Sequence, residues 1–131
     1  MTQSNRAPGE PPASAEHAIR IGQAIAAHEQ WKASLGEAIR AGTSTLDPVV
    51  TARDDRCELG RWLHDLEHTG AATDAGFQSI VAEHRRFHEH AARILRMATD
   101  GRRAAALRAL EGEYAAISAE LESLLRAWRA L

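Results

Sequence analysis

Apolar residues recur every three or four positions along three long stretches of the chain, which is the spacing of an amphipathic α-helix. We therefore expect helices over about 14–41, 75–99 and 102–130, with Ser14 capping the first and Gly42 ending it. The positions expected to face inward are Ile21, Ala24, Ile25, His28, Trp31, Leu35, Ala38 and Ile39 in the first helix, Phe77, Ile80, Val81, His84, Phe87, His88, Ala91, Ile94, Leu95 and Ala98 in the second, and Leu107, Leu110, Tyr114, Ile117, Leu121, Leu124, Trp128 and Leu131 in the third.

The segment between the first two long helices is broken into shorter pieces. Asp47 and Pro48 form a cap and first-turn pair that predicts a short helix. Asp54 or Asp55 can cap a second short helix, and Cys57 is expected in its first turn, where the positive end of the helix dipole favours a thiolate. With short links throughout, the chain is predicted to be all-α, an antiparallel four-helix bundle with a short broken helix that carries the cysteine.

Length and composition predict one domain. The 131 residues are enough to bury a core without disulfides, so we expect a bundle domain over residues 14–131, preceded by a disordered, proline-rich arm over residues 1–13. A net charge of −2 gives no drive towards nucleic acid. The sequence has neither the run of roughly 18 apolar residues of a membrane span nor a secretory signal. We therefore expect a cytoplasmic protein, in a reducing compartment where a free cysteine is stable.

One cysteine and three histidines are the candidate metal ligands. Cys57 is the only cysteine and cannot form an internal disulfide. His28, His84 and His88 fall on inward faces, the last two one helical turn apart. Each alone is more typical of a core residue, but together they are a sufficient tetrahedral set for zinc. One ion would satisfy all four, whereas a core without metal must supply a polar partner for each.

Other polar residues are expected to play smaller parts. Asp65 and Glu83 are candidates to hydrogen-bond the ligand imidazoles. Gly60 and Trp62 are expected to shape the turn and the close packing around the cysteine. The remaining histidines are expected to lie on the surface or to face away from the site: His17, His64, His68 and His90.

The order of these residues resembles a known family. The motifs are His28-x-x-Trp31, Cys57-x-Leu59-Gly60-x-Trp62 and His84-x-x-x-His88. They are similar to the chemoreceptor zinc-binding domain, a bacterial family fused to cytoplasmic chemoreceptors and diguanylate cyclases. The resemblance implies that the family's zinc ligands correspond to His28, Cys57, His84 and His88. It also implies a homodimer that regulates a linked output protein, although this chain is expected to be a stand-alone domain without one.

The predicted function is therefore a zinc-binding regulatory or sensory domain that acts through a partner protein and is not an enzyme. The resemblance implies that it senses zinc or an oxidant such as hypochlorous acid, and zinc-bound thiolates are the groups that oxidants attack. The helix that carries the cysteine is the expected moving part, and the metal-free chain is expected to stay largely helical.

Three other functions compete with this prediction. A structural-zinc adaptor would use the same four ligands. A zinc hydrolase would need water in place of one ligand and a general base such as Glu58 or Glu83. A di-iron, hemerythrin-like bundle would need several inward carboxylates, typically in Glu-x-x-His pairs, and the sequence contains no such pair.

Overall fold

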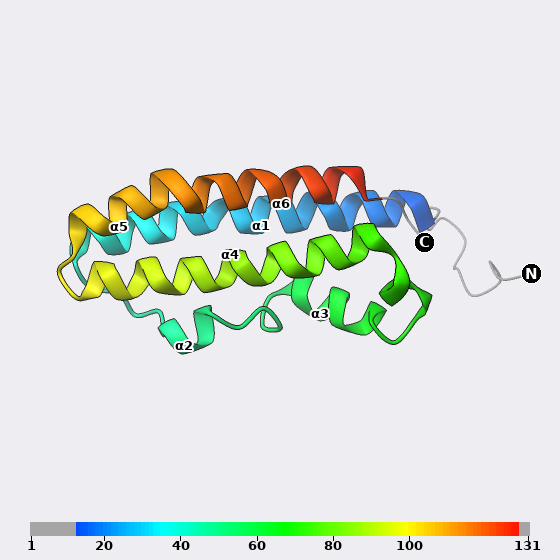
Figure 1. Ribbon diagram of the computed structural model, residues 1–131, viewed down its shortest axis with the longest axis horizontal. Coiled ribbons are helices and arrows are strands. Elements are labelled where there is room, and N and C mark those ends of the chain that lie inside the picture. Colours follow the sequence, from blue (N-terminus) through cyan, green and yellow to red (C-terminus); the bar gives the residue numbers. More distant parts are fainter. Residues whose placement is uncertain (1–12, 129–131) are drawn as a thin grey trace, which may run out of the picture.

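A computed structural model describes residues 13–128 of the chain (Figure 1). The predicted arm over residues 1–13 lies outside this range, except for Ala13, where the first helix begins. The elements are α1 (Ala13–Ala41), α2 (Pro48–Thr51), α3 (Glu58–Leu66), the 3₁₀ turn η2 (Gly70–Thr73), α4 (Ala75–Thr99), α5 (Arg103–Ala109), the π-helical turn η3 (Leu110–Tyr114) and α6 (Ala115–Ala127).

Successive parts of the chain run in alternating directions (Figure 1). α1 runs the length of the molecule, α2 and α3 return together, α4 runs parallel to α1, and α5 to α6 form one long return helix. The predicted all-α bundle with a short broken helix is therefore confirmed, and the described residues contain no strand. No helix in residues 13–128 is both long and apolar enough to span a membrane.

Local signals set most helix ends. Gly42 and Gly101 follow α1 and α4 with φ of 73° and 79°, a left-handed conformation that glycine adopts without strain. Asp47 and Asp74 cap α2 and α4, because each carboxylate accepts a hydrogen bond from a first-turn amide. Ser14 lies inside α1 and is not its cap, contrary to the prediction.

The core lies where the predicted apolar stripes meet, with one change of register. Leu107 was expected to face inward but is 37% exposed, and Ala106 is fully buried instead. The physical reason is η3, because a π turn holds more residues than an α turn and rotates α5 relative to α6. Further along, Leu125 is buried more deeply than Leu124. Leu131, also predicted to face inward, lies outside the described residues.

Candidate metal centre

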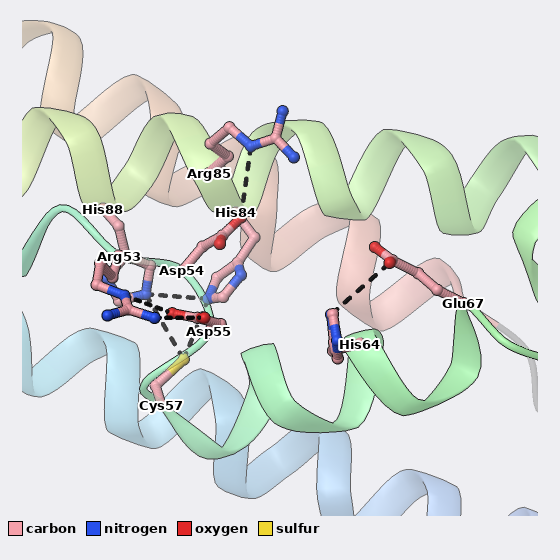
Figure 2. Close-up of polar contacts among 9 residues, drawn as sticks. All are labelled: Arg53, Asp54, Asp55, Cys57, His64, Glu67, His84, Arg85 and His88. Atoms are coloured by element: carbon pink, nitrogen blue, oxygen red, sulfur yellow. Dashed lines mark hydrogen bonds and ion pairs between the residues drawn. The ribbon is translucent and has the colours of Figure 1, made fainter.

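Four polar side chains from three parts of the bundle meet at one point. His28 comes from α1, His84 and His88 come from α4, and Cys57 immediately precedes α3. The three imidazoles are buried, with exposed fractions of 6%, 1% and 2%, and the thiol is half-buried. One donor atom from each side chain lies within 4.8 Å of all the others, and Figure 2 shows two of the imidazoles turned towards the sulfur. The structure thus brings together all four residues that the sequence singled out.

The distances between the donor atoms match a tetrahedral metal site. The Cys57 sulfur lies 3.2 Å from Nε2 of His84, 3.6 Å from that of His88 and 4.0 Å from that of His28. Nε2 of His84 is 3.2 Å from Nε2 of His28 and 3.0 Å from that of His88. Tetrahedral zinc bonds place two nitrogens about 3.3 Å apart, and nitrogen and sulfur about 3.6 Å apart. The cluster is therefore able to hold a metal ion with little rearrangement.

Backbone carbonyls orient two of the imidazoles. Nδ1–H of His28 donates to the carbonyl of Ala24 at 2.7 Å, and Nδ1–H of His88 donates to that of Thr51 at 3.1 Å. A proton held on Nδ1 leaves the Nε2 lone pair free and directed into the cluster. The second hydrogen bond also ties α2, which ends at Thr51, to the site.

The carboxylates predicted for this supporting role do not fill it. Asp65 is exposed on α3, and Glu83 pairs with Arg86, with oxygen and nitrogen 3.1 Å apart. Neither hydrogen-bonds a cluster imidazole in the described part of the chain. Carbonyl partners carry no sequence signature, so the pattern of residue types could not have revealed them.

Burial keeps the imidazoles neutral in the metal-free protein. Loss of hydration, helped by the neighbouring histidines, lowers the pKa of His84 to about 2. Loss of hydration also lowers the pKa of His88 to about 4, and it lowers the pKa of His28 despite the hydrogen bond to the backbone. Neutral imidazole is the form that binds metals.

The thiol of Cys57 responds to burial in the opposite sense. Loss of hydration raises its pKa, and the amides of Gly60 and Leu59 only partly oppose this. The amides at the start of the helix favour a thiolate, as expected, but burial outweighs them and the pKa stays raised. A bound cation would supply the compensating charge, because a coordinating thiol is deprotonated.

Cys57 is itself the N-cap of α3 and does not lie in its first turn. Its backbone is extended, with φ −90° and ψ 165°, and its sulfur accepts a hydrogen bond from the Gly60 amide at 3.3 Å. The predicted caps, Asp54 and Asp55, each pair with an arginine instead (Figure 2). The start of the helix therefore fixes the sulfur at the edge of the cluster.

Close packing next to the cysteine requires glycine. A Cβ atom on Gly60 would lie 1.7 Å from the carbonyl oxygen of Asp54, well inside contact distance. This is the role in close packing that the motif predicted. The loop before α3 can approach the helix only because this position has no side chain.

The remaining histidines lie outside the cluster. His64 and His68 are exposed, and Figure 2 shows His64 pointing to Glu67 and away from the cysteine. His90 bonds to a carboxylate on η3. His17 was predicted to be exposed but is half-buried against two tryptophan rings, a contact across 111 positions that no local signal could have revealed.

Residues of the cluster line several pockets. Cys57 and His28 line a pocket of about 50 Å³ together with Arg20 and Glu58. His84 lines a second pocket, of about 290 Å³, together with Asp54 and other polar residues. The cluster therefore adjoins two separate pockets, one beside Cys57 and His28 and one beside His84.

Comparison with known proteins agrees with this geometry. The family model described as Chemoreceptor zinc-binding domain matches residues 28–95, a little over half of the chain. The matched range begins at His28 and contains the other three cluster residues. No curated protein and no solved structure matched the sequence. With its site geometry and this match, the chain belongs to the chemoreceptor zinc-binding domain family.

Proposed function

We propose that this chain is a zinc-binding regulatory domain in which His28, Cys57, His84 and His88 together hold one zinc ion. The spacing of the four donor atoms, between 3.0 and 4.0 Å for the measured pairs, is the observation that carries the proposal. Imidazole and thiolate donors suit zinc better than they suit magnesium or calcium, which prefer oxygen. The family description supports the same metal.

The proposed role is not catalytic because the protein supplies a full tetrahedral set. A catalytic zinc site keeps a position for water or substrate, whereas four protein ligands leave none. The residues of the cluster would thus bind and release the ion and would carry out no chemistry on a substrate. We propose that the chain is not an enzyme.

The stimulus is proposed to be zinc itself or an oxidant that reaches Cys57. When bound, zinc would hold the sulfur as a thiolate, which is the reactive form. With hypochlorous acid, the thiolate becomes a sulfenic acid and chloride leaves, so that sulfur is oxidised by two electrons and chlorine is reduced by two. A sulfenic acid is a weaker ligand, so α3 would no longer be fixed at the cluster.

The signal is proposed to pass through another protein. The family description names chemoreceptors. The motif resemblance implies that these are bacterial and that diguanylate cyclases are a second class of partner. We further propose that the domain acts as a homodimer in the cytoplasm, where reducing conditions keep Cys57 free to bind metal.

Zinc content of the purified protein tests the proposal. We expect about one zinc per wild-type chain by mass spectrometry, and much weaker zinc retention in Cys57→Ala, because the substitution removes the only negatively charged donor of the set. His64→Ala is the matched control, since His64 lies on the same helix outside the cluster. Wild-type protein that stays zinc-free in metal-replete medium would refute the proposal.

The stimulus is tested by titrating the zinc-loaded protein with hypochlorous acid. Release of zinc in step with modification of Cys57 supports oxidant sensing. Oxidation that leaves the zinc in place would rule it out and leave zinc as the stimulus.

A further inference from the structure

Three aromatic side chains from distant parts of the chain pack together at the end of the bundle where α1 begins. His17 is on α1, Trp62 is on α3, and Trp128 directly follows α6. The ring centroids are 5.2 Å apart for His17 and Trp62, 4.7 Å for His17 and Trp128, and 4.8 Å for the two tryptophans. The histidine meets both indoles edge to face, an arrangement that aromatic rings prefer. We call these three residues the aromatic clasp.

Polar contacts reinforce the clasp. Nε2–H of His17 donates to the carbonyl of Trp128 at 3.1 Å, and this carbonyl is available because Trp128 has left the helical conformation. The guanidinium of Arg20 lies 4.7 Å from the centre of the Trp62 ring, within the range of a cation–π contact. α1 therefore contacts both tryptophans. Trp62 packs against the His17 imidazole and the Arg20 guanidinium, and Trp128 packs against the same imidazole and accepts its hydrogen bond through the backbone carbonyl.

The clasp matters for the metal centre because Trp62 lies on α3 and Cys57 is the N-cap of the same helix. The backbone of α3 approaches that of η2 but scarcely those of the long helices, so side chains hold α3 in place. Leu59 and Leu63 are buried in the core, and Trp62, the clasp residue of α3, is partly buried against the same core. Because α3 is one continuous helix of nine residues, a tilt of the helix at Trp62 would displace the sulfur at its N-cap.

We propose that His17 and Trp128 are positioning residues for the metal centre, acting on Cys57 through Trp62 and α3 without touching the donor atoms. The inference rests on the proposed zinc site. Coupling between two sites is reciprocal. If the clasp strengthens metal binding, bound metal stabilises the clasp by the same factor. Metal binding would then change the stability of the packing where α1 begins and α6 ends, at the same end of the bundle (Figure 1).

The test compares His17→Ala with His90→Ala, a matched control because His90 is also half-buried and hydrogen-bonded to a distant residue, on η3. Zinc affinity is measured by competition with a chelator. Cobalt(II) then serves as a probe, because a bound thiolate gives a sulfur-to-cobalt charge-transfer band in the near ultraviolet. We expect zinc binding about ten-fold weaker in His17→Ala, with a reduced charge-transfer band although cobalt still binds through the imidazoles.

Conservative variants separate positioning from a general loss of structure. His17→Phe keeps a ring edge against both indoles and is expected to recover most of the band. Trp128→Phe keeps the core filled but reduces the ring surface in contact with Trp62. We therefore expect a smaller loss of zinc affinity and of the charge-transfer band than in His17→Ala. Zinc affinity and charge transfer in His17→Ala equal to those of His90→Ala would overturn the inference alone. Wild-type protein that binds neither metal would overturn the zinc proposal together with it.

Discussion

The sulfur of Cys57 is held by the backbone before any metal is considered. It accepts a hydrogen bond from the Gly60 amide, and the extended conformation of Cys57 places it just outside α3. Amide hydrogen bonds favour a negatively charged sulfur, whereas burial disfavours it, and in the metal-free chain burial dominates. The site is thus shaped for a thiolate whose charge only a cation can balance.

Gly60→Ala is expected to damage the fold and the metal site together. The new Cβ would collide with the carbonyl of Asp54, so the loop or the start of α3 must move, and Cys57 moves with them. Overpacking of this kind costs about 1–3 kcal/mol. Chemical denaturation should show this loss, and the zinc content should fall.

Gly22→Ala is the matched control for this substitution. Gly22 lies within α1, and an added Cβ meets no atom within 4 Å. Alanine is the better helix former by about 0.5–1 kcal/mol, so we expect stabilisation and unchanged zinc. If both variants lose the same stability, the close approach at Gly60 is not what makes glycine necessary.

Single residues also show what the sequence could predict. His28, His84 and His88 were predictable as cluster members because each lies on the apolar stripe of a long helix. Their hydrogen-bond partners were not, because Ala24 and Thr51 contribute only backbone carbonyls. The position of Thr51 beside His88 depends on how α2 packs, which no local pattern encodes.

Among the elements, predictability followed length and regularity. The boundaries of α4 agree with the prediction because its apolar stripe is long and lies between the capping Asp74 and the turn at Gly101. The π turn η3 was missed, because apolar residues three and four apart fit an α-helix and a π-containing helix equally well. The start of α3 was misplaced because cysteine, unlike aspartate, is not a common capping residue.

Metal removal is expected to loosen α3 and to spare the long helices. α3 is short and peripheral, and the cluster would fix Cys57, the residue just before it, whereas α1 and α4 each pack against several other elements. Hydrogen exchange after chelation should therefore accelerate over residues 57–66 and stay slow over residues 87–98 of α4. Far-ultraviolet circular dichroism should remain strongly helical. A collapse of the whole helical signal would show instead that the metal is needed for folding.

Three buried histidines lower the free energy of unfolding of the whole molecule. Without metal, their buried Nε2 atoms crowd together, with His84 near both other imidazoles. A bundle of this size buries enough apolar surface to tolerate such a cluster. The cost becomes visible when protons compete for the same lone pairs, because a protonated imidazole cannot stay in this site without losing its hydration.

The stability of the metal-free protein is therefore expected to fall as the pH decreases from about 6.5. In the unfolded chain the three histidines take up protons near pH 6.5. In the folded chain the pKa of His88 is about 4 and that of His84 about 2, and that of His28 is lowered as well. The unfolded state thus binds more protons in this interval, so its free energy falls relative to the folded state. Each histidine contributes up to about 1.4 kcal/mol per pH unit.

Denaturant unfolding of chelator-treated protein at pH 7 and pH 5 measures this loss. His84→Leu removes one of the three titrating groups and keeps the core filled, so its unfolding free energy should depend less steeply on pH. His64→Leu alters an exposed histidine outside the cluster and is the matched control. If the wild-type free energy of unfolding is the same at both pH values, the three imidazoles are hydrated in solution, and the metal-free cluster is more open than the structure described here.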